Sequence, residues 1–198
     1  MSETLSTLVQ RCVHQEEIKK SRFLAHAAPV DSAEQALAFL REVADPAATH
    51  NCWAYRIGQD YRFNDDGEPG GTAGRPILQA IEGQGMDRVM AVVTRWYGGI
   101  KLGAGGLVRA YGGTAAECLR RAEHRAIIPM ATLTLSCPFA DLALFKARLQ
   151  EFDGIITQED FTADGADLQL TLPVTRVQEA IARITDLTRG HGLPVRID

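Results

Sequence analysis

Residues 95–109, RWYGGIKLGAGGLVR, combine five glycines with three basic residues. A continuous apolar run at residues 89–94 precedes this segment and helical spacing of apolar residues follows it, which predicts a strand, a glycine-rich loop and a helix. Free N–H groups at a helix start favour an anion, and glycines let phosphates approach the main chain. The Gly-Lys-Ser/Thr of a Walker A loop is missing, and Val108 replaces the third glycine of a dinucleotide fingerprint. A phosphate-contacting loop and glycines that serve only turns and packing are equally good interpretations.

Basic residues around this loop form a predicted phosphate-binding set. Residues 95–125 carry six basic and two acidic residues, a local charge of +4, and a second basic cluster lies near residue 20. Such clusters suit a phosphate-bearing partner, although a solvated helix face explains Arg120 and Arg121 equally well. Trp96 and Tyr97 could stack on bases, but aromatic residues beside apolar strands more often belong to a core. The predicted nucleic-acid or phosphate contacts are Lys20, Arg22, Arg75, Arg95, Lys101, Gly103, Gly105 and Arg109.

A second glycine-rich segment, residues 64–75, carries the carboxylates of Asp65, Asp66 and Glu68. Carboxylates can bind Mg²⁺ or Ca²⁺, but the EF-hand spacing fails here. Aspartate beside glycine more often accepts hydrogen bonds from nearby backbone amides in a turn. We therefore predict neither a bound metal nor a cofactor, while a long glycine-rich loop remains a place where a compact domain holds function.

His50 and Cys52 are two residues apart in a predicted strand, so their side chains share one face of the sheet. A thiolate–imidazole pair would be a nucleophile, yet no orienting third group is evident and buried cysteine is usually a small apolar residue. His50, Asp65, Asp66 and Glu68 thus form a candidate functional loop without an assigned catalytic residue. A binding protein is a better interpretation than an enzyme.

Glycine content and charge divide the chain near residue 130. Residues 1–130 have zero net charge and contain 14 of the 18 glycines, whereas residues 131–198 carry −4. Apolar spacing in residues 131–198 predicts the order β-α-β-β-α-β, the ferredoxin-like pattern, with Thr175 and Gln178 as a capping box for the second helix. Residues 1–130 also mix strands and helices, so we predict two α+β domains, 1–130 and 131–198.

The composition excludes several classes of protein. The chain has 198 residues, 45% of them hydrophobic, a net charge of −4 and no apolar run long enough to span a bilayer. Its first residues do not resemble a secretory signal. Four cysteines lie far apart, which predicts neither a disulfide framework nor a structural zinc site and favours a reducing cytoplasm.

Four motifs carry a resemblance to a known family: KSRF at residues 20–23, His50-x-Cys52, DDGEPGGTAGRP at residues 65–76, and RWYGGIKLGAGGLVRAY at residues 95–111. Together they resemble the IMPACT family, specifically its bacterial two-domain members of the YigZ type, with Trp96 where tyrosine is expected. The resemblance implies a first domain of ribosomal-protein-like fold with a left-handed βαβ crossover, followed by a ferredoxin-like domain. The same two folds occur in tandem in elongation factor G.

The resemblance also implies a link to translation. Eukaryotic relatives regulate translation initiation by competing for an activator of an initiation-factor kinase, and bacteria lack these partners. We therefore expect a cytoplasmic RNA- or ribosome-associated binding protein that regulates translation or a stress response, with no membrane partner. One alternative is a hydrolase of phosphorylated or peptide substrates, with its site between residues 65–75 and 95–109. The other is a protein-interaction module that docks a partner through the acidic C-terminal domain.

Overall fold

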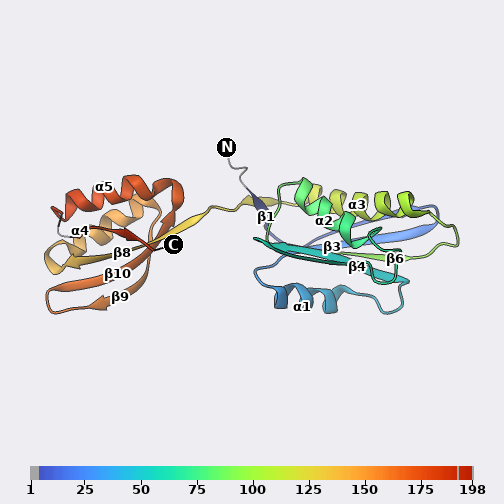
Figure 1. The fold of residues 1–198 in the computed structure, drawn as a ribbon, viewed down its shortest axis with the longest axis horizontal. Coiled ribbons are helices and arrows are strands. Elements are labelled where there is room, and N and C mark those ends of the chain that lie inside the picture. Colours follow the sequence, from blue (N-terminus) through green and yellow to red (C-terminus); the bar gives the residue numbers. More distant parts are fainter. Residues whose placement is uncertain (1–4, 191, 198) are drawn as a thin grey trace. The chain divides into compact units, whose positions relative to one another are not determined.

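The computed structural model describes residues 5–190 and 192–197 of the chain. It contains two compact units, Met1–Ile127 and Ile128–Asp198, called the first and the second domain below. Each has its own sheet and its own apolar core (Figure 1). The predicted α+β class is confirmed. Within the described residues, no helix combines the length and the apolar character needed to cross a membrane.

The first domain is built on a five-stranded sheet in the order β2-β3-β6-β4-β5, with every neighbouring pair antiparallel. β1 and β7 form a separate two-stranded sheet. The elements are β1 (Ser6–Leu8), β2 (Cys12–Ile18), β3 (Ser21–Pro29), α1 (Ala33–Val43), β4 (His50–Ile57), β5 (Asp60–Asn64), α2 (Gly74–Gly83), β6 (Val89–Trp96), α3 (Ala104–Arg121) and β7 (His124–Ala126).

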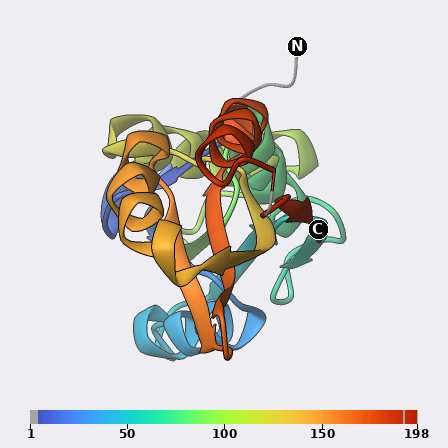
Figure 2. The same ribbon diagram turned by 90° about the vertical axis from the view of Figure 1, so that its left-hand side faces the viewer.

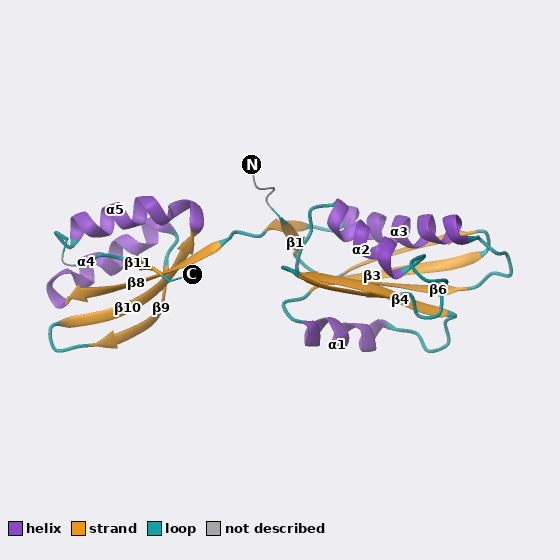
Figure 3. Ribbon diagram, in the orientation of Figure 1, coloured by secondary structure: helices purple, strands orange, loops and turns teal. Residues whose placement is uncertain are grey.

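Helices cover both faces of the five-stranded sheet (Figure 3). Strand alternation in β6 explains how, because Val89, Ala91 and Val93 join the core under α2 and α3, while Met90 and Val92 join the core over α1. Figure 2, turned by 90°, again shows α1 on the opposite side of the sheet from α2 and α3. The predicted central strand is confirmed as β6, which is buried from both faces.

Two helical crossovers of opposite hand connect the strands of this sheet. β3 and β4 both run antiparallel to β6, so β3-α1-β4 is a parallel βαβ unit; β5-α2-β6 is a second such unit, spanning β4. The strands of one unit run opposite to those of the other, the chain crosses the sheet in opposite directions, and the two helices lie on opposite faces. The hand of a crossover changes each time one of these three directions is reversed. Three reversals leave the two units with opposite hands, so one of them must be left-handed. The predicted left-handed crossover, rare among proteins, is therefore present.

The second domain has the ferredoxin-like order, as predicted. Its sheet runs β11-β8-β10-β9, and α4 and α5 lie on one face of it (Figure 1). The elements are β8 (Met130–Pro138), α4 (Phe139–Leu149), η1 (Gln150–Phe152), β9 (Ile155–Phe161), β10 (Gly165–Pro173), η2 (Val174–Arg176), α5 (Val177–Leu187) and β11 (Val195–Arg196). The predicted capping box at Thr175 and Gln178 is wrong. Thr175 lies inside η2, and the N-cap position of α5 is Arg176, with no side-chain cap bond.

Candidate anion-binding site

Three strands place a row of side chains beneath α2 and α3. Arg95 on β6 pairs in register with Phe23 on β3 and His50 on β4, so all three side chains project from the same face. Cys52, two residues after His50, lies on this face as well. The prediction that His50 and Cys52 share one face is confirmed.

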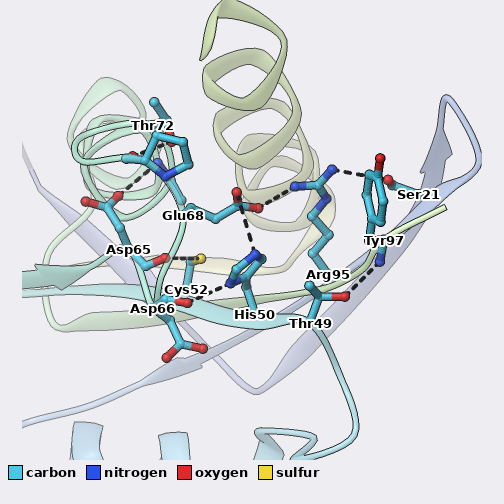
Figure 4. A network of polar contacts seen from close by, with 12 residues as sticks. Ser21, Thr49, His50, Cys52, Asp65, Asp66, Glu68, Thr72, Arg95 and Tyr97 are labelled. Carbon is cyan, nitrogen blue, oxygen red and sulfur yellow. Dashed lines mark hydrogen bonds and ion pairs between the residues drawn. The ribbon is translucent and has the colours of Figure 1, made fainter. Parts of the chain in front are cut away.

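A buried ion pair lies at the centre of this row (Figure 4). Arg95 Nη1 donates to Glu68 Oε1 at 2.6 Å, and the two side chains are only 6% and 4% exposed. Tyr111 on α3 donates its hydroxyl hydrogen to the same oxygen at 2.7 Å, and His50 Nε2 lies 3.7 Å from Glu68 Oε2. Burial raises the pKa of Tyr111, so this hydroxyl stays protonated and remains a donor. The Glu68 carboxylate is thus contacted from two strands, β4 and β6, and from one helix, α3, and the Arg95 charge balances its own.

Asp65 and Asp66 use their carboxylates to hold the backbone. Asp65 accepts hydrogen bonds from the N–H groups of Gly71, Ala73 and Gly74 at 2.8–3.0 Å, which caps the start of α2. Asp66 accepts from the N–H of Asn51 at 2.6 Å. Across residues 5–190 and 192–197, no three His, Cys, Asp or Glu side chains are grouped as metal ligands. Asp65 thus bonds amides of its own loop, as the turn interpretation of the sequence expects, whereas Asp66 ties the loop to β4.

The side chains of Cys52 and His50 form hydrogen bonds with different partners. The Cys52 thiol donates to the carbonyl oxygen of Asp65 at 3.0 Å, whereas His50 Nδ1 donates to the carbonyl oxygen of Asp66 at 2.7 Å. Burial raises the pKa of Cys52 to about 12, so the thiol is protonated at neutral pH. A thiol in this state is not a nucleophile. The arrangement therefore gives no support to a Cys–His hydrolase.

A cavity of about 500 Å³ opens beside the ion pair, between the loop that holds Glu68 and the start of α3. Leu102, Leu107 and Pro69 supply apolar walls, while Lys101 and Tyr97 are solvent-exposed. The N-cap position of α3 is Gly103, which has a φ of 73° and no side chain to cap the first-turn amides. The full lining is Thr49, His50, Glu68, Pro69, Arg95, Tyr97, Lys101, Leu102, Gly103, Ala104 and Leu107.

The predicted phosphate-binding residues divide between this cavity and other places. Lys101 and Gly103 line the cavity, and Gly105 lies in the first turn of α3, where an added Cβ would come 3.5 Å from Nη1 of Arg109. Lys20 lies in the β2–β3 turn close against the loop after β6, because a Cβ on Gly98 would meet the Lys20 carbonyl oxygen at 1.9 Å.

The other basic residues of the predicted set do not join this group. Arg22 projects from the opposite face of the sheet, where its guanidinium lies 3.7 Å from the centre of the Trp96 ring. Arg75 borders a separate groove beside Tyr61 and Phe63. The charge of Arg95 is neutralised by Glu68 rather than free for a phosphate. The predicted basic residues therefore do not form one continuous basic face. Fewer of them lie at the cavity than the sequence suggested.

Sequence reasoning missed two contributors to the site. Tyr111 ends the motif at residues 95–111, and nothing in its spacing indicates the bond to Glu68. Thr49 accepts the N–H of Tyr97 at 2.9 Å and so fixes the loop at the cavity mouth. The Tyr97 ring is 46% exposed and therefore accessible for the stacking that the sequence suggests.

Comparisons with known proteins cover both domains. Residues 19–119 match the family model described as the Impact N-terminal domain, and residues 135–191 match a domain of unknown function (DUF1949). An IMPACT family member "in pol 5'region" of Thermus thermophilus is 48% identical over 179 residues, covering 88% of this chain and 97% of that protein. IMPACT family member YigZ of Escherichia coli is 42% identical over 182 residues, with 88% and 89% covered.

More distant and structural comparisons agree with these matches. Protein IMPACT of Mus musculus is 40% identical over 95 residues, which cover 43% of this chain and 29% of that protein. A crystal structure described as that of a hypothetical protein superimposes with a TM-score of 0.77 at 38% identity, covering 100% of this chain and 99% of the other.

Proposed function

Because the chain belongs to the IMPACT family, we propose that it is a cytoplasmic RNA-binding protein of translation or stress regulation that contacts RNA through the glycine-rich end of its first domain. The observation that carries this proposal is the cavity at the start of α3, bordered by Lys101, uncapped backbone amides and the exposed ring of Tyr97. Single-stranded nucleic acids are held by such combinations of positive charge and aromatic stacking.

The same geometry favours binding over hydrolysis. A hydrolase would need free carboxylates or an activated nucleophile beside the cavity. Asp65 and Asp66 are engaged with backbone amides, Glu68 is paired with Arg95, and the Cys52 thiol is protonated. The groups that a hydrolase would use are therefore committed to holding the loop.

The second domain suits a different partner. Residues 131–198 carry a net charge of −4, which repels phosphates and attracts basic surfaces. We therefore assign RNA contact to the first domain and propose that the second docks a basic protein, such as one on a ribosome.

The test is the salt dependence of RNA binding by the full chain. Fluorescently labelled, mixed-sequence single-stranded RNA is titrated between about 50 and 200 mM salt, and affinity should fall steeply as counterions return to the phosphates. Lys101→Ala should weaken binding and lower the slope of log K against log salt by about one. Arg75→Ala, a matched loss of exposed charge away from the cavity, is the control and should change the slope less. Absence of salt-dependent binding at low ionic strength would overturn the proposal.

A further inference from the structure

We propose that the cavity at the start of α3 receives the terminal phosphate monoester of a nucleotide. The ligand is either the phosphorylated end of an RNA strand or a free nucleoside monophosphate, which present the same chemistry. This inference rests on the proposed function, because it assigns the RNA feature that the site would recognise.

The proposed anion position is defined by the start of α3 and by Lys101 in the loop before this helix. α3 is an 18-residue helix whose first turn contains no acidic residue and has no side-chain cap. Gly103 and Ala104 line the cavity, so the positive dipole end of α3 borders it, and no carboxylate in the first turn of the helix competes for its N–H groups. Lys101, exposed two residues before the N-cap Gly103, adds a full positive charge.

One buried donor in the wall of this cavity lacks a partner. Arg95 lines the cavity with a side chain that is 6% exposed, and its Nη1 and Nη2 atoms bond to Glu68 and Ser21. Its Nε is buried and has no hydrogen-bond partner among the described residues. Buried donors are normally satisfied, since an unpaired one destabilises the fold. Because this atom exposes almost no surface to solvent, a ligand oxygen would complete the guanidinium only when the Arg95 side chain shifts toward the cavity.

The size and lining of the cavity indicate more than a bare phosphate. Its volume of about 500 Å³ exceeds what a phosphate group fills. Leu102, Leu107 and Pro69 offer apolar surface for a sugar and base, and the Tyr97 ring, 46% exposed, offers a stacking face. The Glu68 carboxylate, compensated by Arg95 and Tyr111, does not present an unpaired negative charge to the ligand.

The first experiment compares small ligands on the full chain by isothermal titration calorimetry. Uridine 5'-monophosphate should bind, whereas uridine and inorganic phosphate alone should each bind about tenfold or more weakly, because each lacks half of the recognised groups. Lys101→Ala should weaken the monophosphate about tenfold, the effect of one charge-assisted contact. Arg75→Ala should leave it unchanged. Both side chains are exposed, so neither variant is expected to disturb folding.

The second experiment compares short RNAs that differ only at their ends: 5'-phosphate, 3'-phosphate or hydroxyl. Tighter binding of a phosphorylated RNA, lost in Lys101→Ala, supports the RNA end as ligand. Monophosphate binding without any RNA binding supports the pocket with a free nucleotide and overturns the proposed function. If the monophosphate binds no better than uridine and the three RNAs bind equally, the terminal-phosphate inference is overturned, while salt-dependent RNA binding would leave the proposed function standing.

Discussion

The two domains both pack helices on a sheet, yet they bury different kinds of side chain. Among the described residues, the first domain buries a charged pair together with further polar groups, while the buried polar residue of the second domain is Thr188. The buried polar residues of the first domain are Thr7, Ser21, Glu68, Thr72, Asp87, Thr94, Arg95 and Thr114. Burying charge is costly and gives little net stability, so such groups are often kept for function. The contrast supports placing the proposed ligand site in the first domain.

Ion pairs illustrate the same difference. In the second domain Lys146 meets Glu159 at 2.5 Å with side chains 40% and 25% exposed, so water screens both charges. In the first domain the Arg95–Glu68 pair is almost completely buried. The two pairs have similar lengths, but loss of one partner should cost much more stability at the buried pair.

The largest expected effect concerns the Cys52 thiol. Its pKa of about 12 lies above the usual value of about 8.5, so at pH 8 its thiolate fraction is roughly a thousand-fold lower than that of an ordinary cysteine. Because the thiolate is the reactive form, alkylation by iodoacetamide should be slow at pH 8 and should accelerate with pH over the range in which the chain stays folded. Peptide mass spectrometry of the labelled, folded chain measures this rate. Rapid labelling at pH 8 would show that the Cys52 thiolate is present and accessible, and it would favour the hydrolase alternative.

The next effect is on the stability of the first domain. Glu68→Ala leaves the Arg95 charge buried without its partner, and this should lower the free energy of unfolding by about 3–5 kcal/mol. Glu159→Ala, the matched change at the exposed pair of the second domain, should cost about 0–1 kcal/mol. Urea denaturation followed by circular dichroism gives both values.

A double variant separates charge from packing at this pair. Replacing both partners, as Glu68→Leu with Arg95→Met, removes the unpaired charge and should recover much of the stability lost in Glu68→Ala. Equal losses in Glu68→Ala and Glu159→Ala would contradict the contrast between the domains.

Sequence periodicity predicted the elements whose inward faces are uniformly apolar. The run at residues 89–94 is the central strand β6, and the alternating leucines of residues 168–172 form β10. The pattern failed at β2, which was not predicted. Its inward positions are Cys12, His14, Glu16 and Ile18, so the alternation of hydrophobic and polar residues is blurred. Glu16 is tolerated there because Thr114 of α3 donates to it.

The candidate site was predicted at the level of segments but not of contacts. Both glycine-rich segments do border the cavity. The pairing of Arg95 with Glu68 joins residues 27 positions apart and depends on the path of the intervening loop, which composition does not determine. Arg95 therefore looked like a free cation in the sequence. Residue type alone cannot distinguish a phosphate ligand from a buried counter-ion.

The smallest predicted effect compares helix starts in the two domains. Asp65 caps α2 by accepting the N–H groups of Ala73 and Gly74 and also holds that of Gly71 in the preceding loop, so Asp65→Ala should destabilise the first domain by about 1–2 kcal/mol. Thr175, expected from sequence to cap α5, makes no cap bond there, so Thr175→Ala should change stability by less than about 0.5 kcal/mol. Thermal unfolding of the two variants measures the difference. A larger loss of stability in Thr175→Ala would mean that Thr175 caps α5 in solution. The two domains would then no longer differ in whether a polar side chain holds the start of a helix.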